Sequence, residues 1–325
     1  MSDLLRYLAE EIATDFADGF LTRREALRRL ALLGVGSTAA VSLLAACSSE
    51  PSGAGSATPT ASGGQTSSTA TATSTATASG TASATASAAQ APAPPAPLPA
   101  GVEEIELPGP DGRKLRGTFA AAKQPRGAVL VIHENKGLTD HFRAFPARFA
   151  KENYSALAID LLSEEGGTAS LGDPGAATAA LGKAPPERHV ADLRAGLDEL
   201  TKRAPKAKLG VIGFCFGGGM TWRVIASKDP RVAAAAPFYG PLPDGADFTG
   251  SKAAVLAVYA ELDARVNASR EAAEAALEKA KLVHEVVTFA GADHAFFNDT
   301  GQRYNADAAG KAWTKVLEWF GKHLG

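Results

Sequence analysis

Apolar and polar positions alternate along residues 101–325 in two different ways. Short continuous apolar runs, such as 128–133, are typical of strands buried on both faces of a sheet. Between them, apolar residues recur at helical spacing, as at Val190, Leu193, Leu197 and Leu200. This alternation predicts one α/β domain with a mainly parallel sheet and helices on both faces.

The individual elements follow from the same pattern. A leading hairpin is expected around the turn at 110–112, and the segment 163–185 is polar and glycine-rich. The predicted strands span residues 105–107, 115–120, 128–133, 155–159, 209–212, 232–237, 254–259 and 285–289. The predicted helices span residues 140–152, 187–203, 217–227, 268–281 and 306–323.

Residues 1–47 have the pattern of an export signal. An apolar helical spacing with many acids over 1–20 is followed by Arg23-Arg24, which resembles a twin-arginine signature, and then by the uncharged stretch 30–46. That stretch ends in Leu-Ala-Ala-Cys47, which resembles a bacterial lipobox, so Cys47 is the expected lipidation site. An uncut N-terminal membrane helix is the alternative.

Residues 48–100 consist almost entirely of Ser, Thr, Ala, Gly and Pro. Such a composition buries too little apolar surface to offset chain entropy, so a disordered tether is expected. The three segments together predict a protein exported by the twin-arginine machinery and held by lipid on the extracytoplasmic side of the cell membrane.

Composition excludes some classes of protein. The formal net charge is −2, which gives no basic footprint for nucleic acid. Two cysteines exclude a disulfide framework, and each lies in a motif of its own.

One of these cysteines, Cys215, lies in Gly213-Phe-Cys215-Phe-Gly217, the thiol version of a nucleophile elbow. A strand turning sharply into a helix presents the central side chain at the sheet edge, and a Cβ at either glycine would clash with neighbouring backbone. A dinucleotide loop and a buried structural cysteine are the alternatives. The loop lacks support, since such loops follow the first strand of their domain and no acid ends the strand at 232–239.

Two partners stand at other strand ends. Asp263 follows the strand at 254–259, and His294 follows the strand at 285–289. Nucleophile, acid and histidine in this order are typical of α/β-hydrolases, in which His294 would take the thiol proton and Asp263 would orient the imidazole. Glu261 is the alternative acid.

The other histidines give little support for a metal site. None is paired in H-E-x-x-H spacing. His141, His189 and His323 lie on polar helical faces and are expected to be solvated, His284 precedes an edge-like strand, and His133 ends a central strand beside the site.

Four motifs in this order resemble the dienelactone hydrolase (carboxymethylenebutenolidase) family over essentially all of 101–325: Ile132-His-Glu-Asn-Lys-Gly137, Gly213-Phe-Cys-Phe-Gly-Gly-Gly219, Tyr259-Ala-Glu-Leu-Asp-Ala-Arg-Val-Asn267 and His294-Ala-Phe-Phe-Asn-Asp-Thr300. The resemblance implies an α/β-hydrolase fold without a large cap domain. It also implies that Glu134 contacts the resting thiol and that the backbone N–H groups of Asn135 and Phe216 form the oxyanion hole.

The sequence departs from this family at one substrate contact. Members that act on dienelactone hold its carboxylate with arginines, one of them four residues after the catalytic histidine, where this chain has Asn298. Arg303, Arg188 and Tyr239 are the candidates for substrate binding here.

The expected function is a tethered hydrolase of ester or lactone bonds that passes through an acyl thioester on Cys215 and needs no cofactor. A non-catalytic envelope protein that binds a ligand on the same scaffold is the alternative. A thiol-peroxidase role lacks a resolving cysteine.

Overall fold

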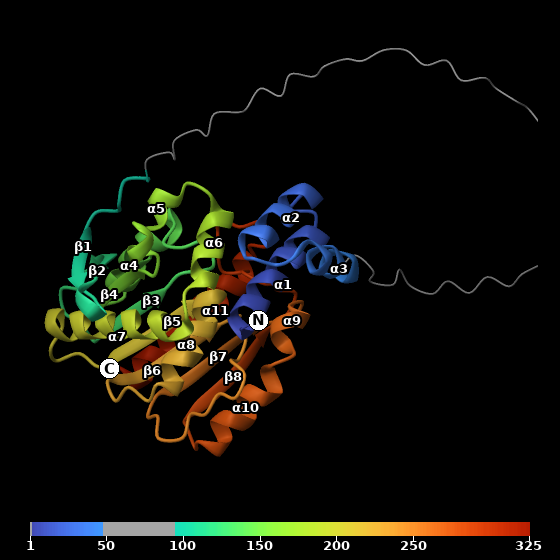
Figure 1. The fold of residues 1–325 in the computed structure, drawn as a ribbon. Helices are drawn as coiled ribbons and strands as arrows, with labels where there is room; N and C mark the ends of the chain where they lie inside the picture. The colour runs from blue at the N-terminus through green and yellow to red at the C-terminus, as the bar shows by residue number, and fades with distance from the viewer. Residues whose placement is uncertain (1, 48–94) are drawn as a thin grey trace, which may run out of the picture.

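The computed structural model describes residues 2–47 and 95–325. An eight-stranded sheet with strand order β1-β2-β4-β3-β5-β6-β7-β8 forms its centre (Figure 1). The strands are β1 (Val102–Pro108), β2 (Lys114–Ala120), β3 (Gly127–Ile132), β4 (Tyr154–Asp160), β5 (Leu209–Phe214), β6 (Val232–Phe238), β7 (Ala254–Ala260) and β8 (His284–Phe289).

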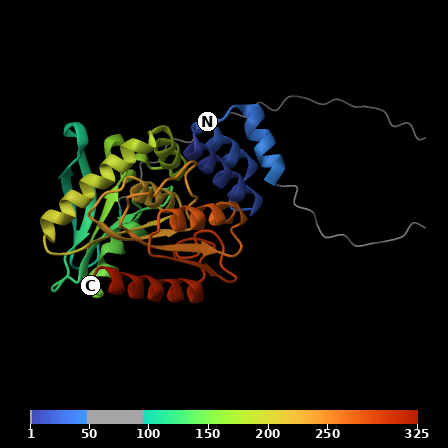
Figure 2. The ribbon, with the colours of Figure 1, turned by 90° about the horizontal axis from the view of Figure 1, so that it is seen from below.

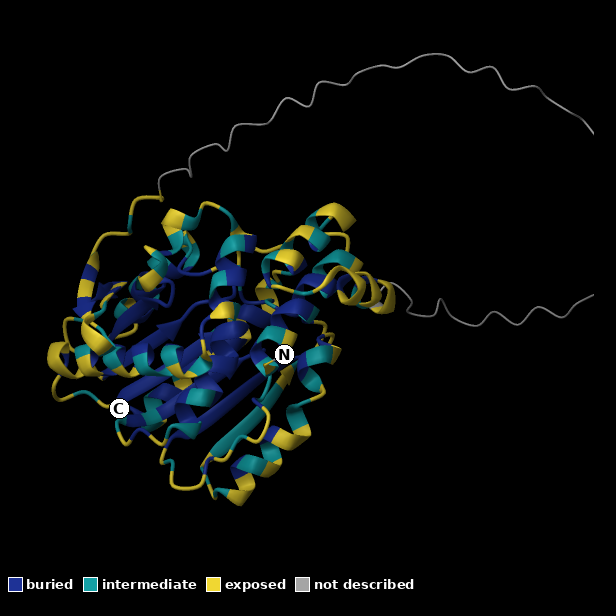
Figure 3. Ribbon diagram, viewed as in Figure 1, coloured by how far each residue is buried: buried dark blue, intermediate teal, exposed yellow. Residues whose placement is uncertain are grey.

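The sheet is parallel from β4 to β8, and only β1 and β2 run antiparallel to their neighbours. The two antiparallel strands form the predicted hairpin, in which Asp111 of the turn at Pro110–Gly112 has a φ of 56°. Parallel strands need both faces covered, and β3, β4, β5 and β7 are indeed buried along their whole length. The predicted α/β class is therefore confirmed (Figure 3).

Helices cover the two faces in pairs. On one face α4 (Asp140–Lys151) packs against α11 (Ala306–His323), where Phe149 lies 4.9 Å from Trp313 between ring centroids. On the other face α7 (Pro186–Arg203) packs against α8 (Phe216–Ala226), which leaves β5 through the elbow. The carboxyl ends of the parallel strands therefore meet beyond one edge of a sheet whose central strands are buried, where sites of this fold class lie.

The helix expected over 268–281 is present as α10 (Arg270–Lys279), and the short helix α9 (Ala264–Asn267) precedes it. One predicted segment differs in the structure. The polar segment 163–185 is largely helical and contains α5 (Thr168–Leu171) and α6 (Pro174–Lys183), in which the Asp173 side chain accepts a hydrogen bond from the N–H of Gly175 and caps α6.

The N-terminal residues form three helices that pack on the domain: α1 (Asp3–Ala17), α2 (Arg23–Leu32) and α3 (Ser37–Cys47). They form one cluster at the side of the sheet (Figures 1 and 2). Ser2 caps α1 and Thr22 caps α2 by accepting backbone N–H bonds, as helix-starting residues do. Leu8 and Leu33 contact α6 beside Gly182, so the cluster is joined to the domain through apolar packing.

Among the helices of residues 2–47 and 95–325, none is long and apolar enough to cross a membrane. The uncharged stretch at 30–46 is broken between α2 and α3. The predicted tether falls mostly on residues 48–94, which lie outside the described residues.

Candidate active site

Cys215 stands at the sharp turn between β5 and α8, in the strained conformation that the elbow motif predicts. Its φ is 56° and its ψ is −118°, a combination that L-residues rarely adopt. A Cβ at Gly213 would lie 2.1 Å from the carbonyl oxygen of Gly217, and one at Gly217 would lie 2.4 Å from the carbonyl oxygen of Ile132. The glycines are therefore required by backbone on both sides of the turn.

The acid and the histidine come together as predicted. His294 Nδ1 lies 2.5 Å from Asp263 Oδ2, and both side chains are buried. Asp263 also accepts the N–H of Val266 at 3.1 Å, which fixes the carboxylate at the start of α9. Glu261, the alternative acid, instead accepts the N–H of Gly291 at 2.7 Å. The pair that orients the imidazole is thus formed with Asp263.

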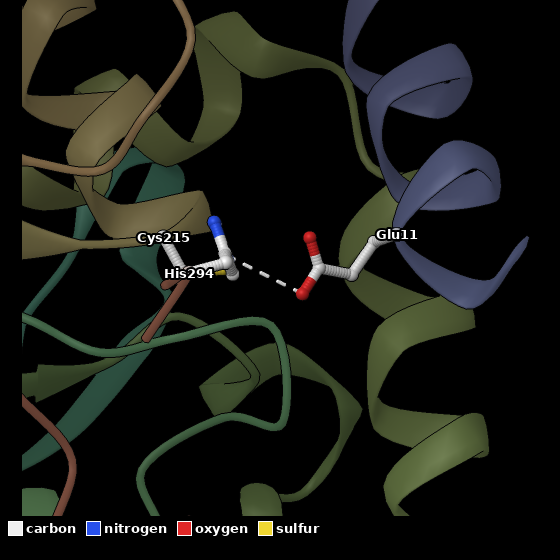
Figure 4. Close-up of side chains that lie close together, drawn as sticks. All are labelled: Glu11, Cys215 and His294. Atoms are coloured by element: carbon white, nitrogen blue, oxygen red, sulfur yellow. Dashed lines mark ion pairs between the residues drawn. The ribbon is translucent and has the colours of Figure 1, made fainter. Parts of the chain in front are cut away.

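The sulfur of Cys215, a nitrogen of His294 and a carboxylate oxygen of Glu11 lie within 4.8 Å of one another (Figure 4). Thiol, imidazole and carboxylate are also the donors that Zn²⁺ prefers. Here Arg265 already pairs with Glu11, and this positive charge opposes a cation at the same place.

Glu134 follows β3 and is buried near the site, but its carboxylate forms hydrogen bonds with two other side chains rather than with the Cys215 thiol. Oε1 accepts from the hydroxyl of Tyr239 at 3.3 Å, and Oε2 accepts from the side-chain amide of Asn298 at 2.8 Å. Burial raises the pKa of Glu134, although the bond from Asn298 opposes the shift. The resemblance implied a contact between Glu134 and the resting thiol. In the structure the Glu134 carboxylate instead connects Tyr239 with Asn298.

The positions predicted for the oxyanion hole come from two segments next to Cys215: Phe216 follows it in the chain, and Asn135 lines the same cavity as the thiol. Phe216 begins α8, so its N–H is among those that lack an intrahelical acceptor. Asn135 lies on the loop after β3, and its carbonyl accepts from the Thr178 hydroxyl at 3.0 Å, which anchors that loop to α6.

Of the predicted substrate-binding residues, Arg188 is engaged away from the nucleophile, whereas Arg303 lines a cavity together with Cys215 but is paired with acids of the N-terminal segment. Arg188 pairs with Glu164 at 2.9 Å and with Glu165 at 2.7 Å. Arg303 contacts Asp15 at 2.9 Å and Asp18 at 2.5 Å, both from the N-terminal segment. Tyr239 is buried with a φ of 33°, and its ring lies 5.3 Å from that of His294.

Two of the histidines that were expected to be solvated, His189 and His141, are covered by the fold. His189 is fully buried, not solvated, because its ring lies 5.5 Å from that of Phe216 in α8 and its Nε2 donates to the carbonyl of Leu181 at 3.0 Å. Burial lowers the pKa of His189 to about 4. His141 is also largely covered and pairs with Asp299, while His133 holds the carbonyl of Glu134 through Nδ1 at 2.7 Å.

The Cys215 thiol is far less accessible to solvent than the elbow motif in the sequence predicts. Cys215 is only 2% exposed, because α1 lies over it and places the Tyr7 hydroxyl 3.2 Å from the sulfur. From the same helix, Glu11 Oε1 lies 3.3 Å from His294 Nε2 (Figure 4). The sequence showed an acidic amphipathic helix over 1–20, but no periodicity indicates where such a helix docks.

These neighbours shift the ionisation of the site. Burial and the Glu11 carboxylate raise the pKa of Cys215, against the opposing effect of His294. Burial disfavours the imidazolium of His294, but the carboxylates of Glu11 and Asp263 outweigh it and raise the pKa of His294 well above its ordinary value.

A cavity of about 260 Å³ opens beside the nucleophile. Cys215, Glu134 and Asn298 line it from the domain, and Glu11 and Asp15 line it from α1. This volume suits a small ligand, and its walls are polar and charged.

A glycine-flanked thiol, a buried aspartate–histidine pair and a parallel sheet define an α/β-hydrolase with a cysteine in the nucleophile position. Residues 115–324 match the model of the dienelactone hydrolase family, and the chain belongs to that family. A Salmonella typhi protein named "Putative carboxymethylenebutenolidase" is 30% identical over 242 residues, which cover 70% of this chain and 88% of that protein. The chain is accordingly a hydrolase of the ester- and lactone-cleaving type.

Solved structures agree with this assignment. The "Putative Dienelactone Hydrolase" from Klebsiella pneumoniae is 28% identical, with a TM-score of 0.60 over 68% of this chain and 99% of that one. The dienelactone hydrolase from Anabaena variabilis shares the fold at 21% identity, with a TM-score of 0.56 over 69% of this chain and 100% of that one.

Proposed function

We propose that the chain is an exported, membrane-tethered esterase or lactonase in which Cys215, His294 and Asp263 act as a catalytic triad. The observation that carries the triad is the 2.5 Å pairing of His294 with Asp263 beside a thiol held at a strained elbow. A ligand-binding protein has no need for an oriented imidazole next to a thiol in this conformation.

The chemistry follows from the positions of these groups. His294 removes the thiol proton, and the thiolate of Cys215 attacks the acyl carbon of the ester or lactone. The oxyanion formed is stabilised by the N–H groups of Asn135 and Phe216, and the imidazolium then protonates the leaving oxygen. Water, deprotonated by the same imidazole, attacks the thioester, and the acid product leaves with the thiol restored. Asp263 keeps the imidazole in the required tautomer throughout.

The substrate class is a small ester or lactone, with dienelactone itself disfavoured. The relatives are named for carboxymethylenebutenolidase, but Asn298 stands where that activity uses an arginine and donates to Glu134 instead. We expect neutral or differently placed polar groups in the substrate of this chain.

Export and tethering are supported by the N-terminal sequence. Arg23 and Arg24 are exposed at the start of α2, where export machinery has access to them. Cleavage before Cys47 would remove α1, α2 and most of α3 and leave the lipid acceptor at the new N-terminus.

One pair of variants tests both parts of the proposal. The chain is expressed in a bacterium with a twin-arginine system, and hydrolysis of aryl esters, short acyl esters and lactones is measured in membrane and soluble fractions. Cys215→Ala is expected to lose hydrolysis by about a thousandfold or more while staying in the membrane fraction. Cys47→Ser is expected to move to the soluble fraction. Full hydrolysis by Cys215→Ala would refute the mechanism, and membrane retention of Cys47→Ser would refute the anchor.

A further inference from the structure

Helix α1 occupies the space directly in front of the nucleophile. The Tyr7 hydroxyl lies 3.2 Å from the Cys215 sulfur, and Glu11 lies within 4.8 Å of the same atom. An acyl carbon must approach this sulfur to about 3–3.5 Å before it reacts. Substrate and α1 therefore cannot occupy the site together.

The catalytic base is engaged by the same helix. In a triad, His294 Nε2 must receive the proton of the thiol, yet here it lies 3.3 Å from Glu11 Oε1. The other oxygen of Glu11 pairs with Arg265, which also lies over the Tyr7 ring at 4.4 Å. Glu11 and Tyr7 thus form one buried group with the two reacting side chains.

The docking face is matched to α1 in charge along its whole length. Asp3 pairs with Arg223 at 2.5 Å near the start of α1, and Asp15 pairs with Arg303 at 2.9 Å near its end. Glu11 and Arg265 lie between them. Arg303 also lies over the Phe20 ring at 4.5 Å, just beyond the helix.

Apolar contacts complete the fit. The inward side of α1 is buried, and its buried apolar residues are Leu4, Tyr7, Leu8, Ala9, Ile12 and Ala13. Helices α2 and α3 brace α1 from behind, and Arg28 of α2 pairs with Asp173 at 2.6 Å. Such a surface is specific for this segment, because charge and shape complement each other at the site itself.

We propose that α1 is an intramolecular inhibitor of this hydrolase, which blocks Cys215 with Tyr7 and Glu11 until the N-terminal helices leave. The inference rests on the proposed function, since it assigns inhibition to the site where hydrolysis takes place. Removal of residues 1–46 during export would then activate the enzyme only after it has crossed the membrane.

The ionisation of the site agrees with an inhibited state. The Glu11 carboxylate raises the pKa of both Cys215 and His294. A neutral thiol is a poor nucleophile, and an imidazolium cannot accept its proton. Departure of Glu11 removes a negative charge from both groups and favours deprotonation of each.

The test uses the full chain, purified from the cytosol of cells without the export system, with Glu11→Arg as the opening variant. An arginine at this position would face Arg265 and His294, so α1 should leave the site. Two rates are measured: alkylation of Cys215 by iodoacetamide, followed by peptide mass spectrometry, and kcat/KM for an aryl ester. Both are expected to rise at least about tenfold, in proportion to the open fraction.

A matched control variant and a rescue by added peptide test whether displacement of α1 causes the faster rates. Glu10→Arg makes the same charge change one residue away. It is expected to leave both rates unchanged, because Glu10 forms no ion pair with any described residue. A synthetic peptide with residues 2–21 is expected to lower both rates of the Glu11→Arg variant, whereas the same peptide carrying Glu11→Arg is not. Asp15→Arg, which opposes Arg303 farther from the triad, replaces Glu11→Arg if the latter fails to fold.

The outcomes separate this inference from the proposed function. If a folded opening variant, checked by circular dichroism, alkylates no faster than the unchanged chain, inhibition by α1 is refuted. If alkylation accelerates while no ester or lactone is hydrolysed, α1 does cover the thiol and the hydrolase function is refuted.

Discussion

The elbow glycines give the sharpest quantitative prediction. Gly213→Ala places a methyl group 2.1 Å from the Gly217 carbonyl oxygen, whereas ordinary contacts of a Cβ begin at 3.4 Å. The nearest obstructing atom belongs to the backbone, which cannot rotate away as a flexible side chain does. Relief therefore requires β5 and α8 to separate by more than one ångström at the nucleophile.

The magnitude follows from this displacement. Overpacking a buried site costs about 1–3 kcal/mol and sometimes more, and a clash with backbone on a buried strand belongs at the upper end. A misplacement of about 1 Å at reacting groups lowers catalysis by about a hundredfold. Gly213→Ala is expected to lose about 3 kcal/mol of unfolding free energy and about two orders of magnitude in kcat.

Gly219→Ala is the matched control. It lies in the same glycine run, but a Cβ there would meet Pro241 at 3.6 Å, an ordinary contact. Since alanine is favoured over glycine inside a helix by about 1 kcal/mol, this variant should be neutral or slightly stabilised, with kcat unchanged.

Urea unfolding and ester hydrolysis are measured for both variants, with hydrolysis in the Glu11→Arg background so that α1 does not limit the rate. Gly213→Ala with unchanged stability and kcat would refute the account of the elbow. Equal losses in both variants would show that the glycines matter for helix α8 as a whole rather than for the turn.

Two further predictions concern buried histidines. Asp263→Asn should lower kcat by about four orders of magnitude with little change in fold, because His294 loses the acceptor that fixes its tautomer, whereas Glu261→Gln should keep kcat. For His189, the folded pKa of about 4 lies below the unfolded value, so its neutral form contributes stability that is complete above about pH 6.5 and is lost as the pH falls toward 4. The loss is at most about 3 kcal/mol and should be absent in His189→Gln, measured by urea unfolding at both pH values.

Each of these predictions has a clear contrary result. An active Asp263→Asn enzyme together with an inactive Glu261→Gln enzyme would transfer the role of the acid to Glu261. A pH dependence of unfolding that is the same in the unchanged chain and in His189→Gln would show that His189 is not buried in its neutral form.

Much of the domain was predictable because its signals are local. Continuous apolar runs identified the central strands, since a strand covered on both faces has no polar side to interrupt the run. The elbow glycines were predictable for a related reason: the turn itself excludes a Cβ, whatever the rest of the fold does. The order Cys215, Asp263, His294 then followed from the rule that such sites lie beyond the carboxyl ends of parallel strands.

Other features required the packed structure. His189 has polar neighbours in sequence, yet the Phe216 ring and the Leu181 carbonyl contact its imidazole. The burial of a helical position depends on partners that periodicity does not identify. Glu134 was expected at the thiol, but Asn298 and Tyr239 hold its carboxylate, because hydrogen bonds between loops depend on where those loops meet.

The sequence by itself determined the class of fold and predicted the elbow at Cys215 with Asp263 and His294 as its partners, because each of these features depends on a short segment with its own physical requirement. The tertiary structure alone decided that Tyr7 and Glu11, more than two hundred residues away along the chain, lie at Cys215. The acids of α1 fit any basic surface, and only the placement of Arg223, Arg265 and Arg303 around the catalytic edge directs the helix onto the active site.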